Sequence, residues 1–261
     1  MRRLLINIGG YKGEVIDIAK LLRDAAYAAA ETGWSALPIT DSLTGYERLS
    51  PGATANVYIS TGIHGDEPAG PLAALELLKQ NAWPAGVNLW LIPCLNPRGY
   101  ELNTRENENG VDLNRDYRTV ATPLAKAHIA WLDARPRFDL SLLLHEDWES
   151  NGFYLYELNP QRRPSIADAI VDAIKEVCPI DLSPVIEGRD AKGGIICANP
   201  DLPKRKDWPE AFYLVHNKTP ISYTLEAPSD FPLVTRVQAL CRGVNAGLGN
   251  IHLLKRDNAG Q

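Results

Sequence analysis

The stretch "STGIHGDEPAGPLAALELL" (Ser60–Leu78) joins a strand-like run to a helix-like run and places His64 three residues before Glu67. The apolar run that leads into it, "NVYISTGI", is typical of a buried strand. Pro68 stands where a helix commonly begins, and the alanines and leucines after it have helical spacing. A strand-to-helix turn with these two side chains can supply two ligands of a metal ion, or it can be a polar turn that contains them by chance.

The same alternation of strand and helix continues along the chain. Strands that are apolar on both faces and separated by helices indicate a largely parallel sheet that helices cover on both sides. The sequence therefore predicts an α/β fold, and no internal repeat or low-complexity linker divides it. Helices are expected at 15–31, 68–79, 123–134, 165–177 and 232–248, and strands at 56–63, 87–95, 138–145, 153–158 and 220–226.

Composition and charge argue against several classes of protein. Of the 261 residues, 45% are hydrophobic and 23% are charged, which is ordinary for a soluble globular protein. The net charge of −5 and the pI near 5.6 argue against a general nucleic-acid binder. No run approaches the roughly 18 apolar residues of a membrane span, and the N-terminus lacks the long apolar core of a secretory signal, so a cytoplasmic protein is expected. The four cysteines form no C-x-x-C pair, which favours reduced thiols.

Polar residues follow several of the predicted strands. In parallel sheets ligands bind beyond the carboxyl ends of the strands, so side chains far apart in the sequence converge there. His145 closes the strand at 138–145 and is the best candidate for a third metal ligand, because no other histidine is so placed. His128, inside a helical pattern, is expected to be an ordinary residue. Asn96 and Glu226 follow two further strands.

A long polar loop, "LNPRGYELNTRENENGVDLNRDY" (95–117), follows the strand at 87–95 and holds Arg98, Arg105, Asn114 and Arg115. Guanidinium groups bind a carboxylate bidentately or stabilise a developing oxyanion. The alternative is a solvated loop whose Asn and Asp side chains make local turn bonds. Arginine and asparagine gathered at the active edge of an α/β sheet favour the first interpretation.

Five segments taken together resemble the zinc carboxypeptidase superfamily, that of carboxypeptidase A. They are "GIHGDE", "NPRG", "TRENENGVDLNRDY", a strand-ending "LLLH" and "YTLEAPS", and they extend over residues 56–229. Their order and spacing are most similar to the small bacterial members without a propeptide. The resemblance implies a three-layer α/β/α sandwich around a mixed, mostly parallel sheet of about eight strands. It also implies that residues 1–261 form a single catalytic domain with one zinc ion per chain.

The resemblance also assigns roles to the metal site. His64, Glu67 and His145 would be the zinc ligands. Glu226, at the end of "ISYTLE", would be the general base that activates the zinc-bound water and then protonates the leaving amine. The chemistry is consistent with these roles, because zinc lowers the pKa of water and a nearby carboxylate can carry the proton.

In the polar loop, the resemblance makes Arg105 the group that polarises the scissile carbonyl and stabilises its oxyanion. Asn114 and Arg115, the "NR" of "DLNRDY", would bind the terminal carboxylate of the substrate. The family also uses a mobile tyrosine upstream of its catalytic glutamate. Tyr213 is the candidate, with Tyr154 and Tyr223 as rivals.

The chain departs from the digestive carboxypeptidases at Asp66, where those enzymes carry an arginine before the glutamate of H-x-x-E. An anion-binding contact is therefore missing or replaced, which bears on the fit of a long peptide. The segment "HEDWES" (145–150) is acidic and favours, weakly, a basic substrate side chain. The specificity pocket is expected in the stretch 187–213, which matches no motif.

The sequence thus predicts a hydrolase, a zinc metallopeptidase that removes the C-terminal residue from short peptides, cell-wall peptides included. An N-acyl amino acid amidohydrolase, as in the desuccinylases and aspartoacylases, is the alternative, since both reactions cleave an amide beside a carboxylate. A zinc-binding protein without catalysis is a third hypothesis. In the first two cases the partner is a small substrate with a free carboxylate, and the sequence does not indicate the oligomeric state.

Overall fold

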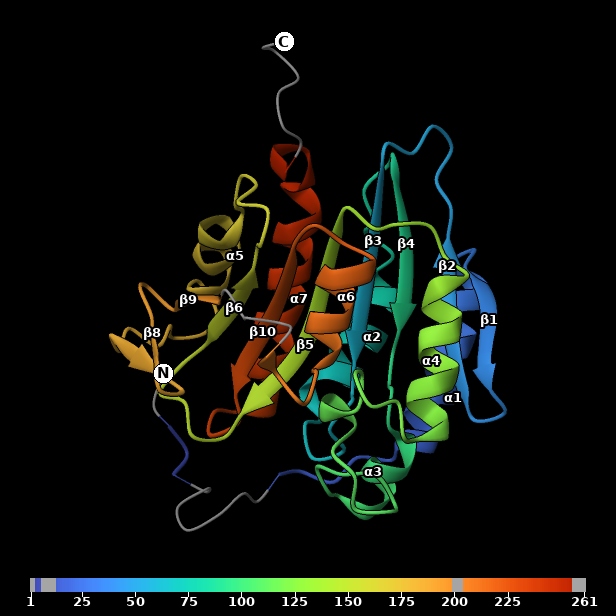
Figure 1. Cartoon of the computed structure of the whole chain (residues 1–261), viewed down its shortest axis with the longest axis horizontal. Coiled ribbons are helices and arrows are strands. Elements are labelled where there is room, and N and C mark those ends of the chain that lie inside the picture. The colour runs from blue at the N-terminus through green and yellow to red at the C-terminus, as the bar shows by residue number, and fades with distance from the viewer. Residues whose placement is uncertain (1–2, 6–12, 199–203, 255–261) are drawn as a thin grey trace.

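An eight-stranded mixed sheet runs through the middle of the molecule (Figure 1). This computed structural model describes residues 3–5, 13–198 and 204–254. The strands are β1 (Ser35–Thr40), β2 (Leu43–Arg48), β3 (Ala55–Thr61), β4 (Val87–Ile92), β5 (Leu140–Asp147), β6 (Tyr154–Leu158), β9 (Ile195–Ala198) and β10 (Ser222–Pro228). Their order is β1-β2-β4-β3-β5-β10-β6-β9, and β7 (Val185–Ile186) and β8 (Arg189–Asp190) form a separate small hairpin.

The centre of the sheet is parallel. β3 pairs in parallel with both β4 and β5, β5 pairs in parallel with β10, and β6 with β9. The antiparallel pairs are β1 with β2, β2 with β4, and β10 with β6. The carboxyl ends of β3, β4, β5 and β10 therefore lie at one edge of the sheet.

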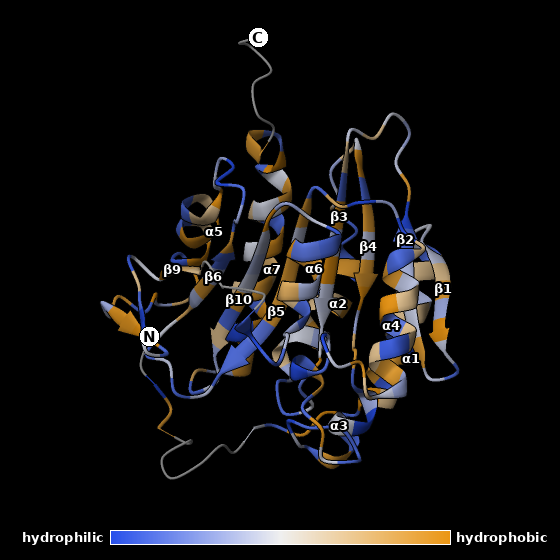
Figure 2. Ribbon diagram, viewed as in Figure 1, coloured by the Kyte–Doolittle hydropathy of each residue, from blue (hydrophilic) through white to orange (hydrophobic). Residues whose placement is uncertain are grey.

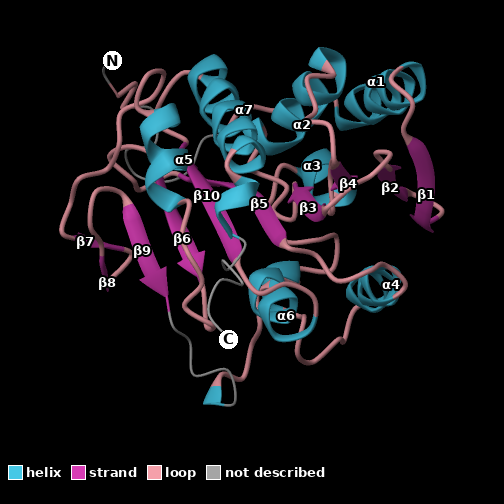
Figure 3. Cartoon of the chain, turned by 90° about the horizontal axis from the view of Figure 1, so that it is seen from above, coloured by secondary structure: helices cyan, strands magenta, loops and turns pink. Residues whose placement is uncertain are grey.

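Helices cover both faces of the sheet, which confirms the predicted three-layer α/β/α architecture (Figure 3). One face carries α1 (Ile18–Glu31), α2 (Ala69–Gln80), α5 (Ala167–Ile174) and α7 (Leu233–Gly249), and the other carries α4 (Pro123–Asp133) and α6 (Glu210–Asn217). Each helical layer packs on its own buried apolar cluster. The central strands are buried on both sides, which explains their continuous apolar runs. Figure 2 shows these apolar strands, with hydrophilic residues where β5 and β10 end.

A short helix, α3 (Pro97–Leu102), holds the turn that follows β3 in place. The side chain of Asn96 caps α3 by accepting from the Gly99 N–H, and it donates to the Ile63 carbonyl at 3.2 Å. The two backbones come so close that a Cβ added at Gly65 would lie 2.0 Å from the Gly99 carbonyl carbon. Glycine is therefore required between His64 and Asp66, and the turn cannot move away from α3 without losing this packing.

Each helix and strand predicted from the sequence is present, with ends that differ by a few residues. The strands β1 and β2 form an antiparallel hairpin that was not predicted. The edge strand β1 has no buried residue and β2 is buried only at Leu43, Gly45 and Tyr46, so neither strand has a continuous apolar run. The stretch 187–213 contains β8, β9 and the start of α6, while its residues 199–203 lie outside the described part. All four cysteines are free thiols. Among the described residues, no helix has both the length and the apolar character that a bilayer crossing needs.

Candidate metal centre and active site

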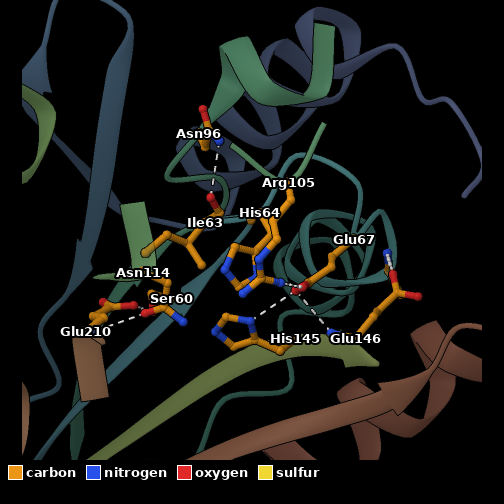
Figure 4. Close-up of polar contacts among 12 residues, drawn as sticks. Ser60, Ile63, His64, Glu67, Asn96, Arg105, Asn114, His145, Glu146 and Glu210 are labelled. Atoms are coloured by element: carbon orange, nitrogen blue, oxygen red, sulfur yellow. Dashed lines mark hydrogen bonds and ion pairs between the residues drawn. The ribbon is translucent and has the colours of Figure 1, made fainter. Parts of the chain in front are cut away.

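His64, Glu67 and His145 come together at the carboxyl edge of the sheet (Figure 4). The parallel register of β3 and β5 pairs Thr61 with Leu144, so the residues that follow these two positions meet. Each of the three side chains offers one ligand atom, and these atoms lie within 4.8 Å of one another. The Nδ1 atom of His64 is 2.6 Å from one carboxylate oxygen of Glu67, and the Nδ1 atom of His145 is 3.0 Å from the other.

The donor set fits a divalent metal ion. Two imidazoles and one carboxylate are a common ligand set of catalytic zinc, which leaves a position open for water or substrate. All three side chains are buried. The Nε2 atom of His64 lies 3.4 Å from Asp112 Oδ1, and a carboxylate at the second ring nitrogen is typical of histidines that bind metals.

Neighbouring charges shift the pKa values of His64 and Glu67 in opposite directions. Burial by itself would lower the pKa of His64, but Glu67 and Asp112 outweigh it and raise the pKa above its usual value. Burial by itself would raise the pKa of Glu67, but the two imidazoles hold it well below its usual range. Glu67 is therefore a carboxylate at neutral pH, the form that binds a metal ion.

The guanidinium of Arg105 lies beside this cluster. Its Nε atom donates to Asp112 Oδ2 at 3.1 Å, and its Nη1 atom is 3.6 Å from Glu67 Oε1. Burial by itself would lower the pKa of Arg105, but Glu67 and Asp112 outweigh it and raise the pKa. The group is half-buried, so it presents a fixed positive charge to the space in front of the three candidate ligands.

Glu226 lies on β10, opposite His145 on β5 and opposite Tyr154 on β6. Burial raises the pKa of Glu226 well above its usual value, and His145 opposes this only in part. A carboxyl group with a raised pKa beside a candidate metal site is suited to both accept and release a proton.

A cavity of about 530 Å³ opens over this cluster. All but one of the predicted site residues line it, so the structure places them around one space. These residues are His64, Glu67, Arg105, Asn114, Arg115, His145 and Glu226, together with Asp66, Asp147, Trp148 and Tyr154 among others.

Tyr213 is the predicted residue that does not line the cavity. Its ring is buried in α6, where the hydroxyl donates to Asp133 at 2.6 Å. Its position therefore gives no support to the predicted substrate contact. Of the two rivals, Tyr223 accepts a hydrogen bond from the Ile166 N–H at the start of α5. Tyr154 lines the cavity, and its hydroxyl donates to Asp147 at 3.1 Å.

Sequence reasoning did not identify a buried clamp behind the candidate metal site. Glu146 accepts from the Ala69 N–H at the start of α2 and from the Ser229 hydroxyl, and the buried Arg236 of α7 donates to it at 2.5 Å. The clamp joins the end of β5 to the first turn of α2, and so fixes His145 relative to Glu67. The only sequence signal for this clamp is the position of Glu146 next to His145. Arg236 gives no signal, because it lies within an ordinary helical pattern.

Comparisons of sequence find partial matches. Residues 49–135 match the family described as "Protein of unknown function (DUF2817)". Carboxypeptidase SOL1 of Arabidopsis thaliana is 33% identical over 104 residues, and the match spans 32% of this chain and 21% of that protein. Murein peptide amidase A of Escherichia coli K12 is 32% identical over 85 residues, which are 33% of this chain and 35% of that protein. The matches thus span about a fifth and a third of these two relatives.

Comparisons of structure extend over nearly the whole chain. A candidate metallopeptidase from Shewanella amazonensis has a TM-score of 0.77 at 23% identity, covering 92% of this chain and 94% of that one. Another, from Shewanella denitrificans, has a TM-score of 0.75 at 25% identity and covers 91% of each chain. A metallo-carboxypeptidase from Burkholderia cenocepacia has a TM-score of 0.66 at 17% identity, covering 90% of this chain and 69% of that one. The chain therefore has the fold of the carboxypeptidase A-like metallopeptidases, and the resemblance that its sequence motifs carry is confirmed.

Proposed function

We propose that this chain is a zinc-dependent metallocarboxypeptidase that hydrolyses the C-terminal amide bond of short peptides. The observation that carries the proposal is the convergence of His64, Glu67 and His145 in one cavity with Glu226 beside them. The fold and the names of the relatives, a carboxypeptidase and a murein peptide amidase, support the same reaction.

In the proposed reaction the metal site and Glu226 act together on a water molecule. Zinc held by His64, Glu67 and His145 would act as a Lewis acid on the scissile carbonyl and lower the pKa of water towards neutrality. Glu226 accepts a proton from this water as the new C–O bond forms. It then delivers the proton to the nitrogen as the C–N bond breaks, so one water molecule is consumed and a neutral amine leaves.

The remaining polar residues of the cavity bind the substrate. Arg105 faces the metal cluster and donates to the oxyanion that develops on the carbonyl oxygen. Asn114 and Arg115 bind the terminal carboxylate, which is where a carboxypeptidase recognises the end of its substrate. Tyr154 lines the cavity and Tyr213 does not, which supports Tyr154 as the tyrosine that contacts the bound substrate.

Two substrate classes fit this site. The Escherichia coli relative is named for murein peptides, which supports short cell-wall peptides as substrates. Asp66 lines the cavity at the position where digestive carboxypeptidases carry an arginine, and this observation favours substrates shorter than a long peptide. N-acyl amino acids are such substrates, so the amidohydrolase is the second candidate function.

A single catalytic domain over residues 1–261 and a cytoplasmic location remain predictions of the same proposal.

A metal analysis together with a substrate panel tests the proposal. We expect about one zinc per chain by elemental analysis. The panel is hippuryl-arginine, hippuryl-phenylalanine, a murein tripeptide and N-acetyl-aspartate, with product release followed by chromatography. Release of the C-terminal residue from a peptide supports the carboxypeptidase. Hydrolysis of N-acetyl-aspartate alone would instead establish the amidohydrolase, and no hydrolysis with zinc bound would support the non-catalytic protein.

A further inference from the structure

Glu210, the first residue of α6, is a buried carboxyl group to which the proposed mechanism gives no role. Glu210 does not line the cavity, and 1% of its surface is exposed. One carboxylate oxygen accepts from the Tyr58 hydroxyl at 2.7 Å. The other accepts from the Ser60 hydroxyl at 2.9 Å (Figure 4). Both donors lie on β3, so Glu210 fastens the start of α6 to the strand that leads to His64.

The backbone of the same residue holds the side chain of Asn114. The Glu210 N–H donates to Asn114 Oδ1 at 2.9 Å. A backbone N–H needs an acceptor, so this bond defines which end of the amide is the oxygen. The NH₂ group of Asn114 then remains to donate into the cavity, and a carboxylate is a pure acceptor that suits it.

Two further contacts join the loop of Asn114 to the segment before α6. The Tyr117 N–H donates to the Trp208 carbonyl at 3.1 Å, and the Arg115 Nε atom lies 3.5 Å from Asp207 Oδ2. These contacts fix the loop and the segment relative to each other. Glu210 adds a side-chain link from this pair of segments to the central sheet.

A chain of buried hydrogen bonds ends at Glu210 and strengthens the connection between α6 and β3. The Tyr58 hydroxyl donates to Glu210, so it must accept from Nε2–H of His128, which is 3.0 Å away. The other ring nitrogen, Nδ1, then accepts from the Tyr117 hydroxyl at 2.7 Å. Tyr117, His128 and Tyr58 thus donate in sequence towards a single acceptor at the end, the Glu210 carboxylate. Such buried and fully satisfied networks hold a single arrangement.

We propose that Glu210 is a positioning residue, which holds the Asn114 amide in the orientation that binds the terminal carboxylate of the substrate. The proposal rests on the carboxypeptidase function proposed above. It deepens that function by assigning the orientation of a substrate-binding group to a residue that does not touch the substrate. Both sets of Glu210 contacts are needed to orient Asn114. The side-chain contacts fix the start of α6, and the backbone N–H holds the Asn114 side chain.

Steady-state kinetics of Glu210→Ala and Glu210→Gln test the proposal. The substrate is hippuryl-arginine, or whichever peptide of the panel the wild-type chain cleaves fastest. For Glu210→Ala we expect KM to rise about tenfold and kcat to stay within about twofold, because a binding interaction rather than a transition-state interaction is lost. Glu210→Gln still has one acceptor, and its NH₂ can donate to the Ser60 oxygen. It should therefore restore KM to within about threefold of wild type.

Two further variants separate positioning from a general effect on folding. Ser60→Ala keeps the carboxylate and removes one of its donors, and it should raise KM by a smaller factor, about threefold. Asn114→Ala removes the group that Glu210 holds. Adding Glu210→Ala to Asn114→Ala should then raise KM no further, because residues that act as a unit are not additive. Multiplied effects in the double variant would overturn the proposal.

A crystal structure of Glu210→Ala gives a readout that does not depend on activity. We expect the Asn114 side chain to leave its hydrogen bond with the backbone of residue 210. An unchanged Asn114 side chain together with an unchanged KM would overturn the positioning role. If the wild-type chain cleaves no member of the panel, it is the proposed function that fails. The orientation of Asn114 in the crystal structure of Glu210→Ala then still tests whether Glu210 holds the Asn114 side chain.

Discussion

Glu226 and His145 occupy the same register position on two neighbouring parallel strands, β10 and β5. Residues directly opposite each other on adjacent strands project to the same face, so the proposed base lies beside a proposed metal ligand. No loop intervenes between them. A constellation built on paired strands is held more precisely than one built on loops, which suits a reaction in which a proton moves between fixed positions.

Replacing the proposed base should remove catalysis and leave the metal in place. We expect Glu226→Gln to lower kcat about a thousandfold, because the variant keeps the shape of the side chain and loses proton transfer. Zinc content by elemental analysis should stay unchanged, since Glu226 is not one of the three proposed ligands. Glu76→Gln, an exposed change on α2, is the matched control and should keep wild-type kcat. Wild-type kcat in Glu226→Gln would remove this residue from the mechanism.

The turn that carries His64 should not tolerate a side chain at Gly65. A Cβ there would lie 2.0 Å from the Gly99 carbonyl carbon, so the backbone of α3 or of the turn must shift. We expect Gly65→Ala to lower the free energy of unfolding by about 3 kcal/mol and to weaken zinc binding. The measurements are urea unfolding and a zinc titration.

Gly249→Ala is the control for this prediction. It lies at the end of α7, and a Cβ added there meets nothing within 4 Å. Its free energy of unfolding should stay within about 1 kcal/mol of wild type. Equal effects of the two variants would contradict the close approach of the turn and α3.

The clamp between Arg236 and Glu146 should be needed for stability. Both side chains have 0% of their surface exposed, and they meet at 2.5 Å. Arg236→Met leaves the Glu146 carboxylate buried without this partner, so we expect a loss of about 3–5 kcal/mol in the free energy of unfolding. Adding Glu146→Gln removes the uncompensated charge and should recover part of the loss. Denaturant unfolding of both single variants and the double variant measures this, and strictly additive losses would contradict the pairing.

His128 should make the protein less stable in mild acid. Burial lowers the pKa of His128 to about 3, against a usual value near 6.5 in the unfolded chain. Between these two values the unfolded state binds the extra proton, so stability falls as the pH falls through this window. The slope from this one group is at most about 1.4 kcal/mol per pH unit.

His128→Gln isolates that contribution, because it removes the titrating group while the other groups stay. The free energy of unfolding of wild type should decline more steeply than that of the variant between about pH 6.5 and pH 4. Urea unfolding at a series of pH values provides the comparison. Parallel pH profiles for the two proteins would show that His128 is not held neutral in the folded state.

The amino-acid sequence determined the α/β class and the places of His64, Glu67, His145 and Glu226 at the ends of strands. It could do so because strands buried on both faces are continuously apolar, and a polar residue at their end is visible as a break in the pattern. The hairpin of β1 and β2 has no such pattern, since β1 has no buried residue and only three residues of β2 are buried.

Only the tertiary structure decided which of the remaining candidate side chains reach the cavity and which buried residues support the site. The sequence offered Tyr213 as the candidate, with Tyr154 and Tyr223 as rivals. Packing buried Tyr213 against Asp133 and placed Tyr154 at the cavity. Glu210 and Arg236 have no local signal, because their partners lie on strands that are distant in the sequence. Sequence periodicity reports which face of an element is buried. The register between elements, which sets the distance between two particular atoms, is determined only when the whole sheet and its helices pack together.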